Sequence, residues 1–329
     1  MGSVLLTGGA GYIGSHTAKA LRSSGREVVV LDSLVTGHRE AIQDLPLVEA
    51  DIADREIVRN TIRRYNVKAV IHFAAFLSES ESIADPNRYY TNNFTKTLEL
   101  LDTLIGESVR NFIFSSTAAV YGSPKEIPIQ EKCPANPISP YGESKLAVER
   151  ALPYFERSYG LRFICLRYFN AAGADTDGKL GEDHNPETHL IPNALNATTG
   201  GPELKIYGDD YETKDGTCER DYVHVSDLAS AHLLALEKLE SGNSSSVYNI
   251  GLERAYSVFN VLKIVENITG NLVPYSVVSR RIGDPAILLA SSDRIRTELG
   301  WRPQHEALDT IVESAWSWHR SHPNGYASV

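Results

Sequence analysis

The sequence predicts an α/β fold: a Rossmann-type doubly wound parallel sheet with a smaller C-terminal lobe interleaved with it. Two observations predict this fold. Short β-branched runs alternate with longer amphipathic stretches through the first 170 residues, and a glycine turn at residues 7–16 (TGGAGYIGSH) joins the first run to the first amphipathic stretch. Alternation of this kind implies right-handed crossovers between parallel strands. The strands read as continuous apolar runs, as expected where helices cover both faces of a sheet.

The expected elements follow in order along the chain. Strands are expected at residues 3–8, 27–32, 68–74, 111–116 and 162–169, and helices at 12–24, 54–65, 86–105 and 140–159. From residue 170 to 220 Gly, Asp, Asn and Pro crowd the chain and the alternation breaks. A strand at 247–250 and a helix at 258–269 are expected to return to or flank the main sheet. We therefore expect a cofactor domain at 1–170, with returning segments at about 221–265, and an interleaved smaller α/β substrate lobe at 171–329.

Composition excludes several classes of protein. The chain has 329 residues, of which 42% are hydrophobic and 22% charged, which is ordinary for a globular protein. Its 32 Lys and Arg against 42 Asp and Glu give a formal net charge of −10, so nucleic acid is not an expected partner. Three distant cysteines fit neither a disulfide framework nor a metal pair. The apolar runs are far shorter than the roughly 20 residues that span a bilayer. We expect a cytoplasmic protein without membrane contact.

The glycine turn is typical of a dinucleotide site. Gly8, Gly11 and Gly14 stand between a strand and a helix, where small residues let backbone approach a pyrophosphate and the helix N-terminus supplies N–H groups. The next strand ends at Asp32, close to the roughly 20-residue spacing of an acid that binds the adenosine ribose. Its carboxylate would repel a 2′-phosphate, which favours NAD over NADP. For each feature taken alone, an ordinary turn remains the alternative.

Two later strand ends are further candidates for cofactor contact. Asp51 and Ile52 are expected to flank the adenine, and Phe73, Ala74 and Ala75 to let the cofactor pass close to backbone. Simple packing at the strand end is the alternative for both.

A catalytic pair is predicted on the helix that begins near residue 140. Tyr141 and Lys145 are four residues apart, so they lie on one helical face. An ammonium beside a phenol lowers the pKa of the phenol from about 10 toward neutrality and makes it a usable general base. Thr117, at the end of the preceding strand, is placed to hydrogen-bond a substrate hydroxyl. The pair alone is common on protein surfaces, and its position after a dinucleotide turn gives it meaning.

A series of collinear motifs resembles the extended short-chain dehydrogenase/reductase family. Besides the glycine turn and Asp32, the series comprises HFAA (72–75), NFIFSSTAAVYG (111–122), SPYGESK (139–145), LRYFN (166–170) and RDYVHVSDLA (220–229). The resemblance covers nearly the whole chain. It implies a tightly held NAD, and 4-epimerisation of a UDP-hexose through a 4-keto sugar with Tyr141 as base and Lys145 and Thr117 beside it. It also implies a homodimer.

The resemblance also implies which residues form each part of the site. The expected cofactor residues are Gly8, Gly11, Tyr12, Ile13, Gly14, Asp32, Asp51, Ile52, Phe73, Ala74, Ala75, Asn92, Ser115, Tyr141, Lys145 and Tyr168. The expected substrate residues are Thr117, Tyr141, Asn170, His189, Leu190, Tyr207, Arg220, Tyr222, Arg281, Asp284 and Leu288. Arg220 and Arg281 are expected on the diphosphate, because a guanidinium fork suits phosphate oxygens.

One loop and one further position depart from the family pattern. The loop at 76–82 has Ser80 where relatives more usually carry glycine, and Leu77 near where some carry lysine, which leaves the contacts of this loop open. Leu288 stands where some family members carry a bulky Tyr. We expect the smaller side chain to leave room for a C2 N-acetyl group, so that UDP-N-acetylhexosamine is also accepted.

Other functions compete with this interpretation. A UDP-pentose or UDP-uronic acid 4-epimerase needs the same catalytic groups. A nucleotide-sugar dehydratase needs a further acid and base, and Ala118 and Ala119 follow Thr117 instead. A non-enzymatic NAD-binding regulator has no use for Tyr141 and Lys145. No metal is expected, because Asp183, His184 and His189 lie in a loop without regular ligand spacing.

Overall fold

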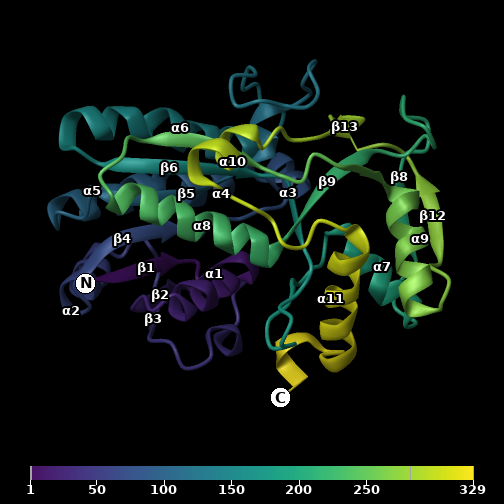
Figure 1. The fold of residues 1–329 in the computed structure, drawn as a ribbon, viewed down its shortest axis with the longest axis horizontal. Helices are drawn as coiled ribbons and strands as arrows, with labels where there is room; N and C mark the ends of the chain where they lie inside the picture. Colours follow the sequence, from purple (N-terminus) through teal and green to yellow (C-terminus); the bar gives the residue numbers. More distant parts are fainter. Residues whose placement is uncertain (1, 282, 329) are drawn as a thin grey trace.

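The computed structural model describes residues 2–281 and 283–328, and its largest element is a seven-stranded sheet in which all neighbouring strands are parallel (Figure 1). The strand order is β10-β6-β5-β4-β1-β2-β3. The bounds are β1 (Ser3–Thr7), β2 (Val28–Asp32), β3 (Leu47–Glu49), β4 (Val67–His72), β5 (Asn111–Thr117), β6 (Arg162–Tyr168) and β10 (Ser246–Ile250). The predicted Rossmann-type fold is confirmed.

Helices cover both faces of this sheet. On one face lie α1 (Tyr12–Ser23), α8 (Val225–Glu240) and α10 (Asp293–Leu299), and on the other lie α2 (Arg55–Arg64), α5 (Lys96–Gly106) and α6 (Pro140–Tyr159). Along β1, Leu6 joins the core under α1 and α8, whereas Leu5 joins the core under α5 and α6. Successive side chains of a strand thus enter two different cores, which explains why the strands are apolar throughout.

Local signals set the ends of the long helices. Ser139 accepts a hydrogen bond from the Gly142 N–H, Pro140 opens α6, and Gly160 ends it in the left-handed region at φ 69°. The helix expected at 86–105 is interrupted. It comprises α4 (Pro86–Tyr89), a π-helical turn η2 (Tyr90–Thr95) and α5. Such turns occur often at functional sites, and periodicity alone does not reveal them.

The smaller lobe follows residue 170 and lies on the right of Figure 1. Strand β9 (Glu219–His224) pairs with β7 (Asn170–Ala172), β11 (Ala255–Ser257) and β13 (Ile287–Leu288), and β8 (Leu204–Tyr207) pairs with β12 (Tyr275–Val278). Three helices complete the lobe: α7 (Leu190–Thr198), α9 (Val258–Thr269) and α11 (Leu308–Ser321). The remaining short elements are α3 (Glu79–Ala84), η1 (Arg39–Ile42), η3 (Ala118–Tyr121) and η4 (Gly325–Ser328).

The chain crosses between the two lobes more than once. Strand β10 returns to the edge of the main sheet and α8 packs on α1, β5 and β6. Helix α9, which we expected to return to or flank the main sheet, instead packs against α7 and α11. Its buried face, with Val261, Leu262 and Val265, completes the core of the smaller lobe.

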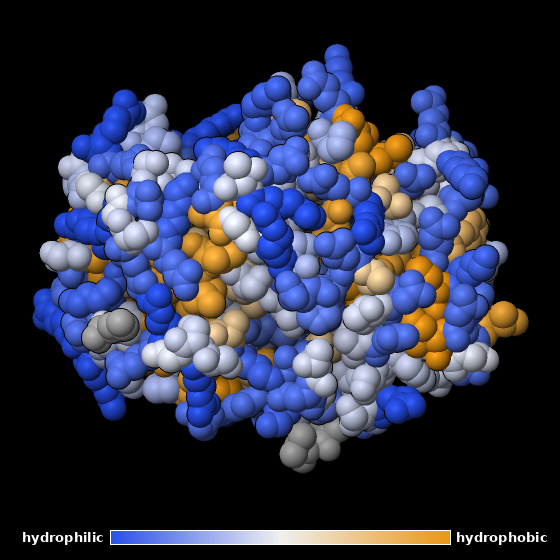
Figure 2. Space-filling view, viewed as in Figure 1, coloured by the Kyte–Doolittle hydropathy of each residue, from blue (hydrophilic) through white to orange (hydrophobic). Residues whose placement is uncertain are grey.

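The visible surface carries no continuous apolar band. Figure 2 shows a mostly hydrophilic face with separate apolar patches. Within residues 2–281 and 283–328, no helix combines the length and the apolar character that crossing a membrane requires.

Candidate active site

The glycine turn packs as a dinucleotide cradle requires. Gly8 has a φ of 71°, and a Cβ there would lie 2.4 Å from the Ala74 amide nitrogen. A Cβ on Gly14 would lie 2.4 Å from the Gly8 carbonyl oxygen. Gly11 is the N-cap residue of α1, and no side chain there accepts a hydrogen bond from the first N–H groups of the helix. The first turn of α1 therefore keeps donors for an anion, and two glycines are needed for the close packing around it.

Asp32 closes the cradle at the end of β2. It is buried, and its carboxylate accepts hydrogen bonds from the backbone N–H groups of Ala10, at 2.9 Å, and Leu34, at 2.8 Å. Burial raises the pKa of Asp32, and these two backbone hydrogen bonds oppose the rise. The carboxylate is therefore held against the turn, where the ribose of a dinucleotide is expected.

Of the other expected cofactor residues, Phe73, Ala74 and Ala75 lie at the end of β4, whereas Asp51 and Ile52 have other contacts. Ala74 follows β4 beside the glycine turn, and its N–H donates to the Thr7 carbonyl at 3.0 Å, as the Phe73 N–H does at 2.7 Å. Ala75 follows them. Asp51, in contrast, pairs with Lys96, and the Ile52 side chain is buried in the core.

The first residues of α1 lie beside the cradle but point elsewhere. The Tyr12 hydroxyl donates to the Gly173 carbonyl at 2.6 Å, and Ile13 packs against the main core.

Tyr141 and Thr117 meet at the carboxyl end of the main sheet. Tyr141 is the second residue of α6 and is 8% exposed, and Thr117 ends β5. Burial raises the pKa of Tyr141 to about 12, the Thr117 hydroxyl opposes the rise by hydrogen bonding, and the charge of Glu79 adds to it. The phenol and this hydroxyl are thus neighbours.

Lys145 is enclosed rather than directed at the phenol. It is 1% exposed, its Nζ donates to the Ser115 carbonyl at 3.0 Å, and it lies 5.1 Å from the centre of the Phe114 ring. Burial lowers the pKa of Lys145 to about 7. The expectation that Lys145 brings the pKa of Tyr141 toward neutrality is therefore wrong for this structure, because desolvation of the phenol dominates.

The remaining cofactor candidates are Ser115, Tyr168 and Asn92. The hydroxyls of Ser115 and Tyr168 bond across β5 and β6. Asn92 lies in the π-helical turn and donates to Asn93 at 3.1 Å. Asn93, which sequence reasoning missed, binds both backbone groups of Phe76, at 2.9 and 3.0 Å, and so anchors the start of the divergent loop. The sequence signal for Asn93 was a polar residue inside a predicted helix, and only the structure shows that it is buried.

Four of the expected substrate residues lie on β9 or on the strands paired with it. Asn170 of β7 lies opposite Tyr222, and Leu288 of β13 lies opposite Arg220. Because β7 follows β6 after one residue, this small sheet begins beside Tyr168 and the catalytic end of the main sheet.

The two candidate phosphate-binding arginines lie near Tyr141. Arg220 pairs with Asp284, and the guanidinium of Arg281 lies 4.0 Å over the ring centre of Tyr207. Glu79 was missed by sequence reasoning. Desolvation by the surrounding protein atoms raises the pKa of Glu79, although part of the residue is exposed, Asp284 adds to the rise, and Arg220 and Arg281 oppose it. Glu79 also acts on Tyr141, so these charges and the phenol share one region.

A second missed residue positions this sheet. Asp221 is fully buried between Arg220 and Tyr222, and it accepts N–H bonds from Leu252 at 2.8 Å, Glu253 at 3.0 Å and Ala290 at 3.2 Å. Burial raises its pKa to about 7, and the three backbone donors oppose the rise. Asp221 thus ties two loops to β9. Its place inside the RDYVHV motif was the available signal.

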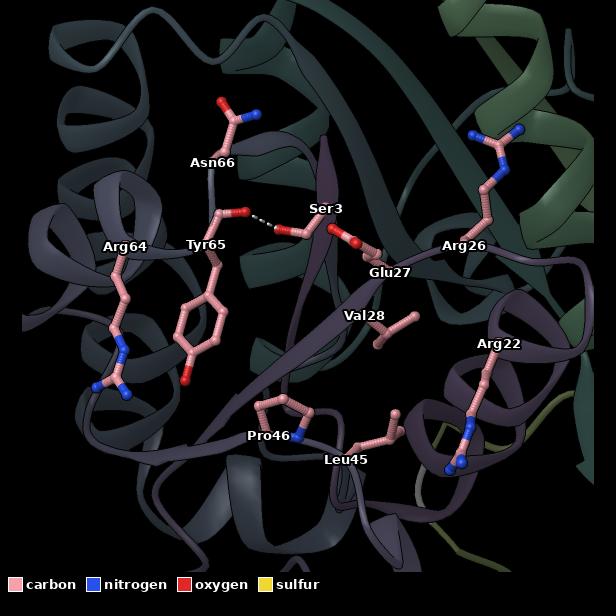
Figure 3. A pocket seen from close by; sticks show the side chains of 10 residues that line it. All are labelled: Ser3, Arg22, Arg26, Glu27, Val28, Leu45, Pro46, Arg64, Tyr65 and Asn66. Carbon is pink, nitrogen blue, oxygen red and sulfur yellow. Dashed lines mark hydrogen bonds between the residues drawn. The ribbon is translucent and has the colours of Figure 1, made fainter. Parts of the chain in front are cut away.

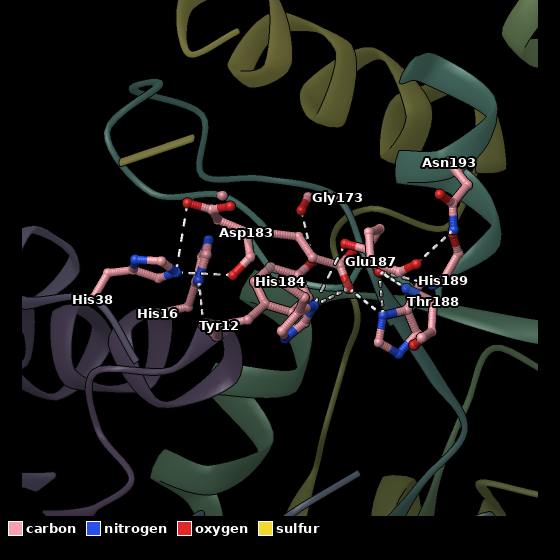
Figure 4. A network of polar contacts seen from close by, with 12 residues as sticks. Tyr12, His16, His38, Gly173, Asp183, His184, Glu187, Thr188, His189 and Asn193 are labelled. Atoms are coloured by element: carbon pink, nitrogen blue, oxygen red, sulfur yellow. Dashed lines mark hydrogen bonds and ion pairs between the residues drawn. The ribbon is translucent and has the colours of Figure 1, made fainter. Parts of the chain in front are cut away.

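His189 and Leu190 lie at the start of α7. Leu190 is the first residue of α7, and His189 precedes it with its Nδ1 bonded to Glu187 at 3.0 Å (Figure 4). The expected substrate contact of His189 therefore competes with carboxylates of its own loop.

One surface hollow lies away from this region. It has a volume of about 550 Å³ and is lined by residues such as Ser3, Val28 and Asn66, at the amino ends of parallel strands (Figure 3). Ligands of open α/β sheets bind at the carboxyl ends. Its Arg22 and Arg26 already pair with Asp44 and Glu240, so we assign no function to the hollow.

Comparisons with known proteins agree with this geometry. The NAD dependent epimerase/dehydratase family model matches residues 4–251. A UDP-glucose 4-epimerase of Halalkalibacterium halodurans is 47% identical over 327 residues, 99% of this chain and 98% of that protein. The structure of a UDP-glucose 4-epimerase from Brucella ovis with NAD is 47% identical, covers 96% of this chain and 98% of its own, and has a TM-score of 0.94. The UDP-Glc/GlcNAc 4-epimerase of Campylobacter jejuni is 39% identical, covers 98% and 100%, and has a TM-score of 0.85.

Proposed function

This chain belongs to the NAD dependent epimerase/dehydratase family, and we propose that it interconverts UDP-galactose and UDP-glucose by 4-epimerisation with Tyr141 as the base. The observation that carries the assignment is the meeting of Tyr141 and Thr117 at the carboxyl end of a sheet whose first turn forms a dinucleotide cradle. The curated relatives of this chain that are 47% identical over nearly its whole length carry the same activity in their names.

In this reaction the Tyr141 oxygen takes the proton of the sugar 4-hydroxyl, and later returns it. NAD held by the glycine cradle and Asp32 would supply the hydride acceptor for sugar C4 and the hydride donor for the 4-keto sugar. Thr117 hydrogen-bonds the reacting hydroxyl, and the Lys145 ammonium, which donates to the Ser115 carbonyl, would hold the nicotinamide ribose with its remaining donors. The glycine cradle and Asp32 fit NAD, because the cradle has no space for side chains and the acid stands where the ribose is expected.

The smaller lobe, residues 171–329, holds the sugar nucleotide in this proposal, and residues 1–170 hold the cofactor. Arg220 and Arg281 bind the diphosphate, and Asn170, Tyr207 and Tyr222 line the pocket beside it. Asp284 neutralises Arg220 until the diphosphate takes its place.

We also propose that the protein is a cytoplasmic homodimer. Two aromatic side chains on the outer face of α6 support the dimer: Tyr154 is 65% exposed and Tyr159 is 53% exposed. Light scattering after size exclusion tests it. A particle of one chain mass would contradict the dimer.

Proton NMR of the purified protein with UDP-galactose, without added cofactor or reductant, tests the activity. We expect UDP-glucose to appear, because hydride leaves and returns within one site. An unchanged spectrum from protein that releases NAD on denaturation would overturn the hexose assignment, and UDP-xylose and a UDP-uronic acid would then be tried.

Replacing Asp32 by Ala is expected to lower NAD affinity about 10- to 100-fold, because the acid loses its hydrogen bonds to the ribose. The measurement is the NAD released per chain on denaturation after extensive dialysis. Asp44→Ala, which removes an exposed partner of Arg22, is the control and should keep its NAD. Equal NAD content in both variants would contradict the role of Asp32.

Leu288→Tyr is expected to lower turnover of UDP-N-acetylglucosamine relative to UDP-glucose. Leu288 lies opposite Arg220 in the small sheet, and a larger side chain there narrows the sugar pocket. A clash with one acetyl group is worth about 1–3 kcal/mol, or roughly 10- to 200-fold in the ratio of kcat/KM values. The hypothesis fails if Leu288→Tyr leaves that ratio unchanged.

A further inference from the structure

Four side chains of one loop converge outside the proposed catalytic groups. Glu182, His184, Glu187 and His189 lie between β7 and α7, and one donor atom of each lies within 4.8 Å of all the others. Figure 4 shows the two imidazoles and the Glu187 carboxylate turned toward one another from this loop. The sequence did not predict this convergence, because the loop has no regular ligand spacing and only its fold brings the four groups together.

The four histidine–carboxylate separations in the cluster are close to those between ligand atoms around a tetrahedral metal ion. The His189 Nδ1 lies 2.8 Å from Glu182 Oε1 and 3.0 Å from Glu187 Oε1. The His184 Nδ1 lies 3.3 Å from Glu182 Oε1 and 3.5 Å from Glu187 Oε2. Zinc bonds of about 2.0–2.1 Å in a tetrahedron place neighbouring ligand atoms about 3.3 Å apart.

One of these four groups makes no hydrogen bond at its buried ring nitrogen. The Nδ1 atom of His184 is buried and makes no hydrogen bond to any described residue, although two carboxylate oxygens lie within 3.5 Å of it. Both imidazoles aim Nδ1 at the same oxygen of Glu182, a residue that is 5% exposed. Neither contact has the geometry of a hydrogen bond, and a metal ion would bind all four groups at once.

The charges and the access route also suit a divalent cation. With both imidazoles deprotonated, as metal ligands must be, the four groups carry a charge of −2, which a divalent ion balances, and imidazole nitrogen with carboxylate oxygen is a donor set that zinc accepts. The His189 side chain is 44% exposed, so an ion can enter from solvent.

We propose that Glu182, His184, Glu187 and His189 bind one divalent transition-metal ion of the zinc class, in a closed structural site. The site joins two parts of the protein. The Tyr12 ring, within the glycine turn at the start of α1, meets the His184 ring edge to face at 6.3 Å, and His189 directly precedes α7. A metal ion there holds the loop between the cofactor cradle and α7, and it makes His189 a metal ligand instead of a substrate contact.

The test uses the full chain after dialysis against a chelator, with metal content measured by mass spectrometry and binding followed by titration with Zn²⁺ and Co²⁺. We expect one ion per chain, Co²⁺ absorption typical of four-coordinate sites, and a higher Tm with Zn²⁺. His184→Ala and Glu187→Gln should each weaken Zn²⁺ binding by at least about tenfold, since each removes one ligand. His322→Ala, which removes a histidine outside the cluster, is the matched control and should bind as the parent does.

Each outcome of the test decides the proposal. Binding of one ion that both ligand variants lose supports it, and circular dichroism shows whether each variant is folded. Failure of the parent to bind Zn²⁺ overturns it, and so does equal binding by the parent and a folded ligand variant. The NMR assay of epimerisation is independent, because metal content and Tm are read without substrate.

Discussion

Replacing Tyr141 by Phe is expected to lower kcat for UDP-galactose epimerisation by about 10²–10⁴-fold, because the phenol is the group that takes and returns the proton. The ring remains, and it is 8% exposed in its pocket, so folding should be retained. The NAD released on denaturation should be unchanged. The measurement is the initial rate of UDP-glucose formation by proton NMR across a range of pH.

Tyr154→Phe is the matched control, because Tyr154 lies on the same helix with its side chain 65% exposed. It should keep the parent rate. If Tyr141→Phe keeps more than about a tenth of the rate, the phenol is not the main base, since general base catalysis contributes at least about 10²-fold.

Arg167→Ala should lower the free energy of unfolding by about 3–5 kcal/mol, because it leaves the Glu149 carboxylate buried without its partner. The Arg167 and Glu149 side chains are 8% and 4% exposed. Arg167 Nε donates to both Glu149 oxygens, at 3.0 and 3.1 Å, and its Nη1 donates to the Tyr121 hydroxyl at 2.9 Å. This network links α6 to β6 directly below the catalytic end. Urea unfolding followed by circular dichroism measures the loss.

The exposed pair of Arg150 and Glu143, on the same helix, provides the control. Its side chains are 62% and 39% exposed, so Arg150→Ala should change the free energy of unfolding by less than about 1 kcal/mol. A double replacement, Arg167→Met with Glu149→Leu, should recover much of the stability, since no buried charge is left unpaired. Equal losses for Arg167→Ala and Arg150→Ala would contradict the role of burial.

Local patterns were sufficient for the main sheet. The apolar runs and the amphipathic stretches between them predicted β1, β2, β4, β5 and β6, and Ser139, Pro140 and Gly160 place the ends of α6 where the pattern expected them. The π-helical turn at Tyr90–Thr95 was not predicted, because a single inserted residue barely changes helical periodicity.

The candidate site was only partly predictable. Tyr141, Thr117 and the glycine cradle follow from motif order, and the structure brings Tyr141 and Thr117 together. Glu79, Asn93 and Asp221 were missed because their importance comes from partners that are distant along the chain. The direction of the Tyr141 pKa was also mispredicted, because spacing on a helix does not reveal how deeply the phenol is buried.

The sequence by itself determined the fold class, the cofactor end and the position of the Tyr141 and Lys145 pair on α6. These features depend on contacts between residues near one another along the chain, and strand, turn and helix signals encode such contacts directly. Only the tertiary structure decided that Lys145 bonds the Ser115 carbonyl, that Arg220 pairs with Asp284, and that two histidines and two glutamates converge. Those contacts depend on desolvation and on distances between separate elements, which exist only once the chain has folded.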